Sequence, residues 1–220
     1  MPEQLVLPFH ARQGFGREAF IAAPCNEQAL RFVERWPDWP AQAAVLYGPK
    51  GSGKSHLVSV WRELSGAAYV TAEQLSPDAL PADGPLVVED VDAVPPSLGR
   101  DRTLLALFER PSAALLLTGR KPPSEWETAI GDLRSRFDSV LAFPLWAPDD
   151  SLMAALVRKH FADRQLEVPD AVVRRILTHV ERSPEAVASF VARADAKALA
   201  EKRAVSERLV LELLDAEERG

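Results

Sequence analysis

Short apolar runs alternate with amphipathic stretches through the first two thirds of the chain. The runs predict strands near 43–47, 67–71, 86–90, 113–118 and 139–143, of which the one at 43–47 is expected to be buried. Helical spacing between them gives a β–α alternation, which is typical of a parallel sheet covered by helices. One helix is expected near 27–36, with Asn26 as its N-cap and its end before Pro37. The pattern therefore predicts the α/β class, with a five-stranded parallel sheet.

Strand-like runs stop at about Asp149, and only helical spacing follows. Helices are expected near 150–164, 170–181, 185–201 and 206–218, with Pro169 and Pro184 at helix starts. The leader, punctuated by Gly14 and Gly16, has no helical period and is expected to be flexible. We therefore expect three parts, which are a leader at 1–16, an α/β base at 17–148 and a small all-α lid at 149–220.

A phosphate-binding loop is predicted between the first strand and the helix that follows it. Residues 48–55 match the pattern G-x-x-x-x-G-K-[ST] at every fixed position. Glycines let consecutive N–H groups point at phosphate oxygens, and the next helix turns its positive end to the same anion. We expect Lys54 to reach the β- and γ-phosphates and the Ser55 hydroxyl to bind Mg²⁺. A chance match is the alternative, but the strand–loop–helix context argues against it.

Polar residues that follow two other strands supply candidate catalytic groups. Glu89 and Asp90 end the run at 86–90, where Glu89 would serve Mg²⁺ and Asp90 would polarise the attacking water. Asp is more usual than Glu at the first of these two positions, so Glu89 leaves open how the metal would be coordinated. Solvated acids at a strand end are the alternative. Thr118 ends a further strand, where it would sense a γ-phosphate if that strand lies between the other two. A plain strand end before Gly119 fits Thr118 equally well.

Four segments together resemble the DnaA family of AAA+ ATPases. They are residues 20–26 (FIAAPCN), 53–57 (GKSHL), 117–123 (LTGRKPP) and 132–137 (DLRSRF). The resemblance covers about residues 15–218 and implies a P-loop AAA+ domain that binds ADP or ATP with Mg²⁺. It also implies an arginine finger at Arg136, for which a local ion pair with Asp132 or Asp138 is the alternative. The implied nucleotide contacts are Phe20, Ile21, Pro49, Lys50, Gly51, Ser52, Gly53, Lys54, Ser55 and His56.

The same resemblance implies a phosphate-sensing arginine near the start of the third lid helix. Arg182 lies just before that helix and is our candidate. The family's Arg-x-Leu spacing, counted back from Val187, falls on Glu185 instead. A solvated arginine at the helix end is an equally good interpretation of Arg182, so the register stays open.

The leader resembles the short peptide by which bacterial proteins dock on the DNA polymerase sliding clamp. Leu7 and Phe9 would be apolar anchors, and Gln4 would offer amide hydrogen bonds beside Leu5. Pro8 would stiffen the extended peptide, so that less entropy is lost on docking. The alternative is a leader that packs its apolar residues on its own domain.

Composition narrows the possible partners. The net charge of −6 argues against holding DNA by electrostatics alone. Cys25 is the only cysteine, which excludes an internal disulfide, and no apolar run is long enough for a membrane span. These features predict a cytoplasmic chain with no membrane partner. Neither the N-terminal partner domain nor the C-terminal helix-turn-helix of DnaA is expected here, so sequence-specific DNA binding is not expected.

Within the family, the chain resembles short DnaA-related regulators of replication initiation. The resemblance implies DnaA and the sliding clamp of DNA polymerase III as partners, an expected homodimer, and stimulated hydrolysis of DnaA-bound ATP. Intrinsic ATP hydrolysis would be weak at most. The alternatives are a stand-alone ATPase of the helicase-loader type, which shares residues 53–57, and a scaffold that binds nucleotide only structurally. The leader favours the regulator, because a loader has no need of a clamp peptide.

Overall fold

A single parallel sheet organises the first part of the chain in the computed structural model, which describes residues 16–80, 83–110 and 114–217. The strand order is β2-β3-β4-β1-β5, and all pairs are parallel. The α/β class and the five-stranded parallel sheet are thus confirmed, and β4 lies between β1 and β3 as the role considered for Thr118 requires. The strands are β1 (Ala43–Tyr47), β2 (Ala68–Thr71), β3 (Leu86–Glu89), β4 (Leu115–Gly119) and β5 (Leu141–Pro144).

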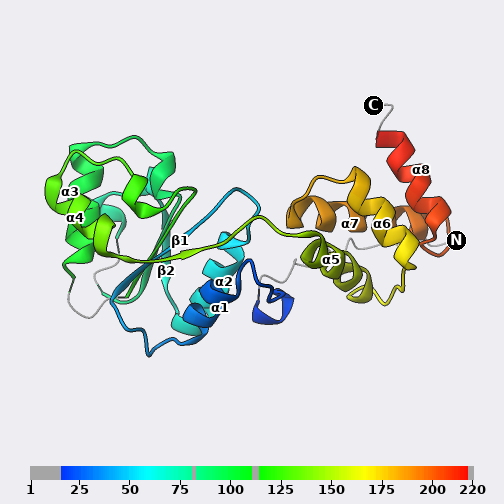
Figure 1. Cartoon of the computed structure of the whole chain (residues 1–220), viewed down its shortest axis with the longest axis horizontal. Helices are drawn as coiled ribbons and strands as arrows, with labels where there is room; N and C mark the ends of the chain where they lie inside the picture. Colours follow the sequence, from blue (N-terminus) through cyan, green and yellow to red (C-terminus); the bar gives the residue numbers. More distant parts are fainter. Residues whose placement is uncertain (1–15, 81–82, 111–113, 218–220) are drawn as a thin grey trace, which may run out of the picture.

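Helices cover both faces of the sheet (Figure 1). Side chains alternate across a strand, so consecutive residues of β1 enter different cores. Ala44 and Leu46 pack with α1 and α2, whereas Val45 packs with α3 and α4. These helices are α1 (Glu27–Glu34), α2 (Lys54–Ser65), α3 (Leu98–Phe108) and α4 (Gly131–Ser139). Short 3-10 turns are η1 (Arg17–Ala19), η2 (Ala72–Gln74), η3 (Pro77–Ala79), η4 (Val91–Ala93) and η5 (Pro123–Glu125).

The rest of the described chain is helical and has its own core. Phe161, Phe190 and Leu209 are fully buried at the centre of that core. Figure 1 shows this bundle beside the sheet-containing part, joined to it by the segment after β5. Its helices are α5 (Asp150–Ala162), α6 (Asp170–His179), α7 (Pro184–Ala200) and α8 (Glu207–Glu217). The domain boundary near Pro148 stays a prediction. No helix in the described residues combines the length and apolarity that crossing a membrane needs.

The segment before α1 contacts both cores. Phe20 is buried in the core under α1 and α2, while Ile21, Ala23 and Cys25 pack against the helical bundle. The backbone N–H of Trp146, in the connection after β5, donates to the Cys25 carbonyl at 3.0 Å. The two parts of the chain are therefore linked at this point by backbone and by apolar contacts.

Asn26 precedes α1, but its side chain does not cap that helix, so the sequence-based expectation is wrong in this respect. Its Oδ1 accepts the Ala23 N–H at 2.9 Å, and its Nδ2 donates to the Ile21 carbonyl at 3.0 Å. Buried polar atoms are nearly always hydrogen-bonded, and the Asn26 side chain meets this requirement with backbone groups of the loop. Here those bonds hold the preceding loop, which also lines the cavity described below.

A carboxylate in the last helix should make the stability of the bundle depend on pH. The hydrogen bond from Arg203, with a second from Arg208, lowers the pKa of Glu212 to about 2. The folded pKa is depressed, so this contribution is present above the unfolded pKa and is lost as the pH falls toward 2. We expect Glu212→Gln to lower the melting temperature at pH 7, modestly because the group is partly exposed.

Thermal unfolding at several pH values measures this effect. The difference in melting temperature between Glu212→Gln and the unmodified chain should shrink between pH 5 and pH 2. Glu207→Gln in the same helix is the control, because no ion pair joins Glu207 to another described residue. A difference that stays constant over this range would show that the pairing with arginine does not stabilise the fold.

Candidate functional site

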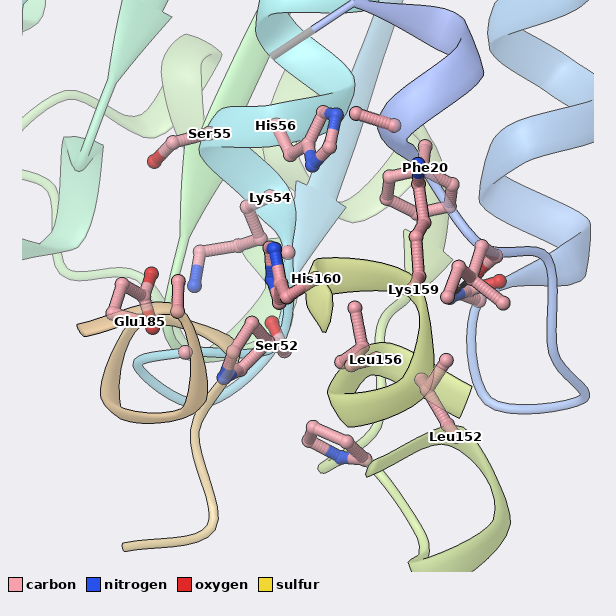
Figure 2. A pocket seen from close by; sticks show the side chains of 18 of the residues that line it. Phe20, Ser52, Lys54, Ser55, His56, Leu152, Leu156, Lys159, His160 and Glu185 are labelled. Atoms are coloured by element: carbon pink, nitrogen blue, oxygen red, sulfur yellow. Dashed lines mark hydrogen bonds between the residues drawn. The ribbon is translucent and has the colours of Figure 1, made fainter. Parts of the chain in front are cut away.

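A cavity of about 450 Å³ lies where the phosphate loop meets the helical bundle (Figure 2). This volume is within the usual range for small-molecule sites. The loop lines it from Lys50 to His56, and helices α5 and α7 contribute residues from the other side. Phe20 and Ile21 also line it. The structure thus brings together most of the residues predicted to contact nucleotide, although Pro49 is not part of the lining.

The loop backbone has the conformation that an anion-binding turn needs. Gly53 precedes helix α2 with φ of 98°, in the left-handed region that side chains other than glycine rarely adopt. A Cβ on Gly48 would lie 2.0 Å from the Leu145 carbonyl oxygen, so only glycine fits this close approach. The start of α2 then points its free N–H groups and positive dipole end into the cavity.

Lys54 is the first residue of α2, and its side chain is buried beneath the loop. Its Nζ donates to the Gly48 carbonyl at 2.8 Å and to the Pro49 carbonyl at 3.0 Å. Burial lowers the pKa of Lys54 below its usual value, while Asp90 and Asp92 oppose that shift. An ammonium group has three N–H donors, so Lys54 can hold the loop with two of them and still donate a hydrogen bond to an anion with the third.

The two residues predicted to serve Mg²⁺ are in direct contact. The Ser55 hydroxyl donates to a Glu89 carboxylate oxygen at 2.5 Å, and the Tyr69 hydroxyl donates to the other oxygen at 2.5 Å. Burial together with Glu89 raises the pKa of Tyr69 to about 12. Among the described residues, no group of three or more His, Cys, Asp or Glu could hold a metal alone. Ser55 and Glu89 fit Mg²⁺ as a pair of oxygen ligands, which the ion usually completes with phosphate oxygens and water.

Strand β3 ends at Glu89, one residue earlier than expected, because Asp90 turns into the left-handed region with φ of 57°. The Asp90 N–H donates to the Thr118 hydroxyl at 2.9 Å, and Asp90 lines the cavity. Thr118 is fully buried and lies outside the lining. Its hydroxyl therefore positions the Asp90 backbone.

Helix α5 contributes cavity residues that the sequence analysis did not identify. Leu152 and Leu156 form an apolar side with Phe20, and Lys159 and His160 lie one turn further along the helix (Figure 2). Burial, then the nearby Arg164, lowers the pKa of His160. Arg120, directly after β4, also lines the cavity. The only signal in the sequence was helical spacing, which predicted a lid helix near 150–164 but not its place at the cavity.

The two candidates for the phosphate-sensing position lie in different environments. Arg182 is exposed, forms an ion pair with Asp150 and is not part of the cavity lining. Glu185, in the first turn of α7, does line the cavity. Of the two candidates, the one that reaches the cavity is therefore the carboxylate Glu185 and not Arg182.

Arg136 lies away from the cavity, on the exposed side of α4. It lines a separate shallow hollow with Glu109 and Asp132. Asp138 is paired with Arg134 instead, at 3.8 Å, and no ion pair among the described residues joins Arg136 to Asp132 or Asp138. The local-pair alternative thus finds no support. The predicted clamp-binding residues lie outside the described residues, namely Gln4, Leu5, Leu7, Pro8 and Phe9.

Comparison with known sequences identifies replication initiators. No protein-family model matches the chain. DnaA of Clavibacter sepedonicus is 23% identical over 232 residues, which cover 91% of this chain and 48% of that protein. DnaA of Nautilia profundicola is 22% identical over 207 residues, covering 81% of this chain and 47% of that protein. The chain spans about half the length of the curated relatives it matches.

Solved structures share the fold over nearly the whole chain. Domain III of Thermotoga maritima DnaA has a TM-score of 0.72 at 17% identity, covering 92% of this chain and 96% of that one. AMPPCP-bound DnaA from Aquifex aeolicus has a TM-score of 0.75 at 16% identity, covering 92% and 68%. The RuvB branch migration motor of Thermotoga maritima reaches 0.72 at 15% identity, covering 93% and 72%. The chain therefore has a DnaA-like AAA+ fold with a phosphate loop at residues 48–55, and its sequence is similar to DnaA replication initiators over most of its length.

Proposed function

We propose that the cavity binds ADP or ATP. The phosphates would lie on the loop, where Lys54 and the N–H groups at the start of α2 meet an anion. The base would lie on the apolar side formed by Phe20, Leu152 and Leu156. A neighbour with the same fold binds AMPPCP, which supports this assignment.

Mg²⁺ would be held by Ser55 and Glu89 together with phosphate oxygens, which requires the Ser55–Glu89 hydrogen bond to open. The ion, when bound, neutralises charge on the phosphates. Asp90 lines the cavity and would orient water through its carboxylate, while Thr118 holds its backbone. The Glu89 carboxylate also accepts a hydrogen bond from Tyr69, which makes it less available to Mg²⁺. We therefore expect intrinsic ATP hydrolysis to be weak.

We further propose that the chain is an Hda-like regulator of replication initiation. In this account it docks on the sliding clamp and stimulates hydrolysis of the ATP that DnaA holds. The observation that carries the proposal is the position of Arg136, which is exposed and lies outside the chain's own cavity. An arginine in that position is free to place its charge on the γ-phosphoryl oxygens of a neighbouring molecule.

A stand-alone ATPase motor is the second candidate, and the likeness to the RuvB motor favours it. The two candidates differ in what hydrolyses ATP. A motor should hydrolyse ATP without DnaA and should respond to DNA or to a helicase. A regulator should show little hydrolysis alone and should accelerate the loss of DnaA-bound ATP. Phosphate release with each component omitted in turn separates the two.

Clamp docking should depend on the leader. Gln4→Ala combined with Leu7→Ala removes the amide and one apolar anchor of the six-residue peptide, so co-migration with the sliding clamp should be lost. Gel filtration of the mixture measures this, and ADP binding of the variant should be unchanged. A variant that keeps wild-type affinity for the clamp would exclude the peptide assignment.

A further inference from the structure

Helix α7 rests on the phosphate loop and brings a carboxylate to it. A Cβ on Gly51 would lie 3.1 Å from the Ser183 Cβ and 3.5 Å from a Glu185 carboxylate oxygen. Ser183 caps the helix, accepting the Ala186 N–H, and Pro184 is its first residue. These two features fix the first turn, so Glu185 is held beside the loop. Figure 2 shows Glu185 on the same side of the cavity as Ser52 and opposite Phe20.

No hydrogen bond or ion pair neutralises Glu185 within the part of the chain that the structure describes. The nearest basic residue along the chain, Arg182, is held by Asp150 outside the cavity. Lys159 of α5 pairs with Asp163, the residue directly after that helix, at 3.0 Å. On the phosphate side of the cavity, α7 therefore contributes one negative charge, while Lys50, Lys54 and Arg120 line the same cavity with positive charge.

The charge of Glu185 acts where phosphates are expected. Like charges separated by a few ångströms repel, and because Glu185 is exposed, water and salt weaken this repulsion without abolishing it. The penalty rises with the charge of the ligand, and a nucleoside triphosphate carries one more negative charge than the diphosphate. A carboxylate fixed beside the loop thus disfavours the triphosphate more than the diphosphate.

We propose that Glu185 is a specificity-determining residue that makes this cavity favour nucleoside diphosphates over triphosphates. The inference rests on the proposed nucleotide site. Replacing the carboxylate by a neutral or positive group should shift the preference toward the triphosphate.

Calorimetry with ADP and with AMPPCP, each with Mg²⁺, tests this proposal. The unmodified chain should bind ADP more tightly than AMPPCP. Glu185→Gln should shift the ratio of the two dissociation constants toward AMPPCP by about threefold, and Glu185→Arg by about tenfold or more. The shift should shrink at high salt, because salt screens charges that water can reach. Glu185→Gln keeps the size of the side chain, so it remains informative if Glu185→Arg unfolds the protein.

Glu207→Arg is the matched control, because it makes the same charge change on α8, outside the cavity. Its ratio should equal that of the unmodified chain. A ratio that neither Glu185 variant changes, or a preference for AMPPCP in the unmodified chain, would overturn the inference and leave the nucleotide site intact. If neither nucleotide binds the unmodified chain, the proposed function falls together with this inference.

Discussion

Arg136→Ala should lose most of the stimulation of DnaA-bound ATP hydrolysis while ADP binding and clamp binding stay intact. The expected loss is about a thousandfold, the scale on which an arginine supplied in trans stabilises a phosphoryl transition state. The physical reason is that Arg136 is exposed on α4 and lines a hollow separate from the chain's own cavity. Single-turnover release of phosphate from DnaA–ATP measures the effect.

Two further variants sharpen this test. Arg136→Lys keeps the charge but removes the planar fork of donors, so it should restore only part of the stimulation. Arg102→Ala removes an exposed arginine from the neighbouring helix α3 and should have no effect. Normal stimulation by Arg136→Ala would exclude the finger role. If Arg136→Ala instead loses its own ADP, the residue acts within its own chain, which favours the motor.

Lys54→Ala should weaken ADP binding by about tenfold or more, because it removes the ammonium group from the phosphate loop. The Lys54 Nζ also holds the carbonyls of Gly48 and Pro49, so its loss should loosen the loop as well. Lys54→Met keeps the apolar stem and separates the loss of charge from the loss of packing. Both variants should bind weakly if the charge is what matters.

Calorimetry with ADP gives the affinities, and the melting temperature reports whether each variant is folded. Lys202→Ala is the control, because Lys202 is exposed after α7 and lies outside the cavity. Equal ADP affinity in Lys54→Ala and the unmodified chain would mean that the loop at 48–55 does not bind phosphate.

The sheet was predictable because its signals are local. Each buried strand is a short apolar run, and the observed bounds of β1 are those predicted from the run at 43–47. The end of β3 was missed by one residue because Asp90 enters the left-handed region, which Asp tolerates and which leaves no trace in the apolar pattern. The role of the Asn26 side chain was missed for a similar reason, since its partners are the backbone groups of a loop.

The far side of the cavity was less predictable, because it depends on how the helical bundle packs against the loop. Lys159 and His160 lie more than a hundred residues from the loop in sequence, and their helical spacing also fits a lid core. Choosing between Arg182 and Glu185 required knowing where α7 begins, which the Ser183 cap and Pro184 fix. The pairing of Arg182 with Asp150 then accounts for its position outside the cavity.

The most direct test of the central claim is the rate of DnaA-bound ATP hydrolysis with this chain and DNA-loaded sliding clamp present together. Radiolabelled ATP would be loaded on DnaA, free nucleotide removed, and conversion to ADP followed over time. The account predicts fast conversion only when chain, clamp and DNA are all present, and slow conversion when any one is omitted. An unchanged rate in the complete mixture, with rapid hydrolysis of free ATP by the chain alone, would contradict it.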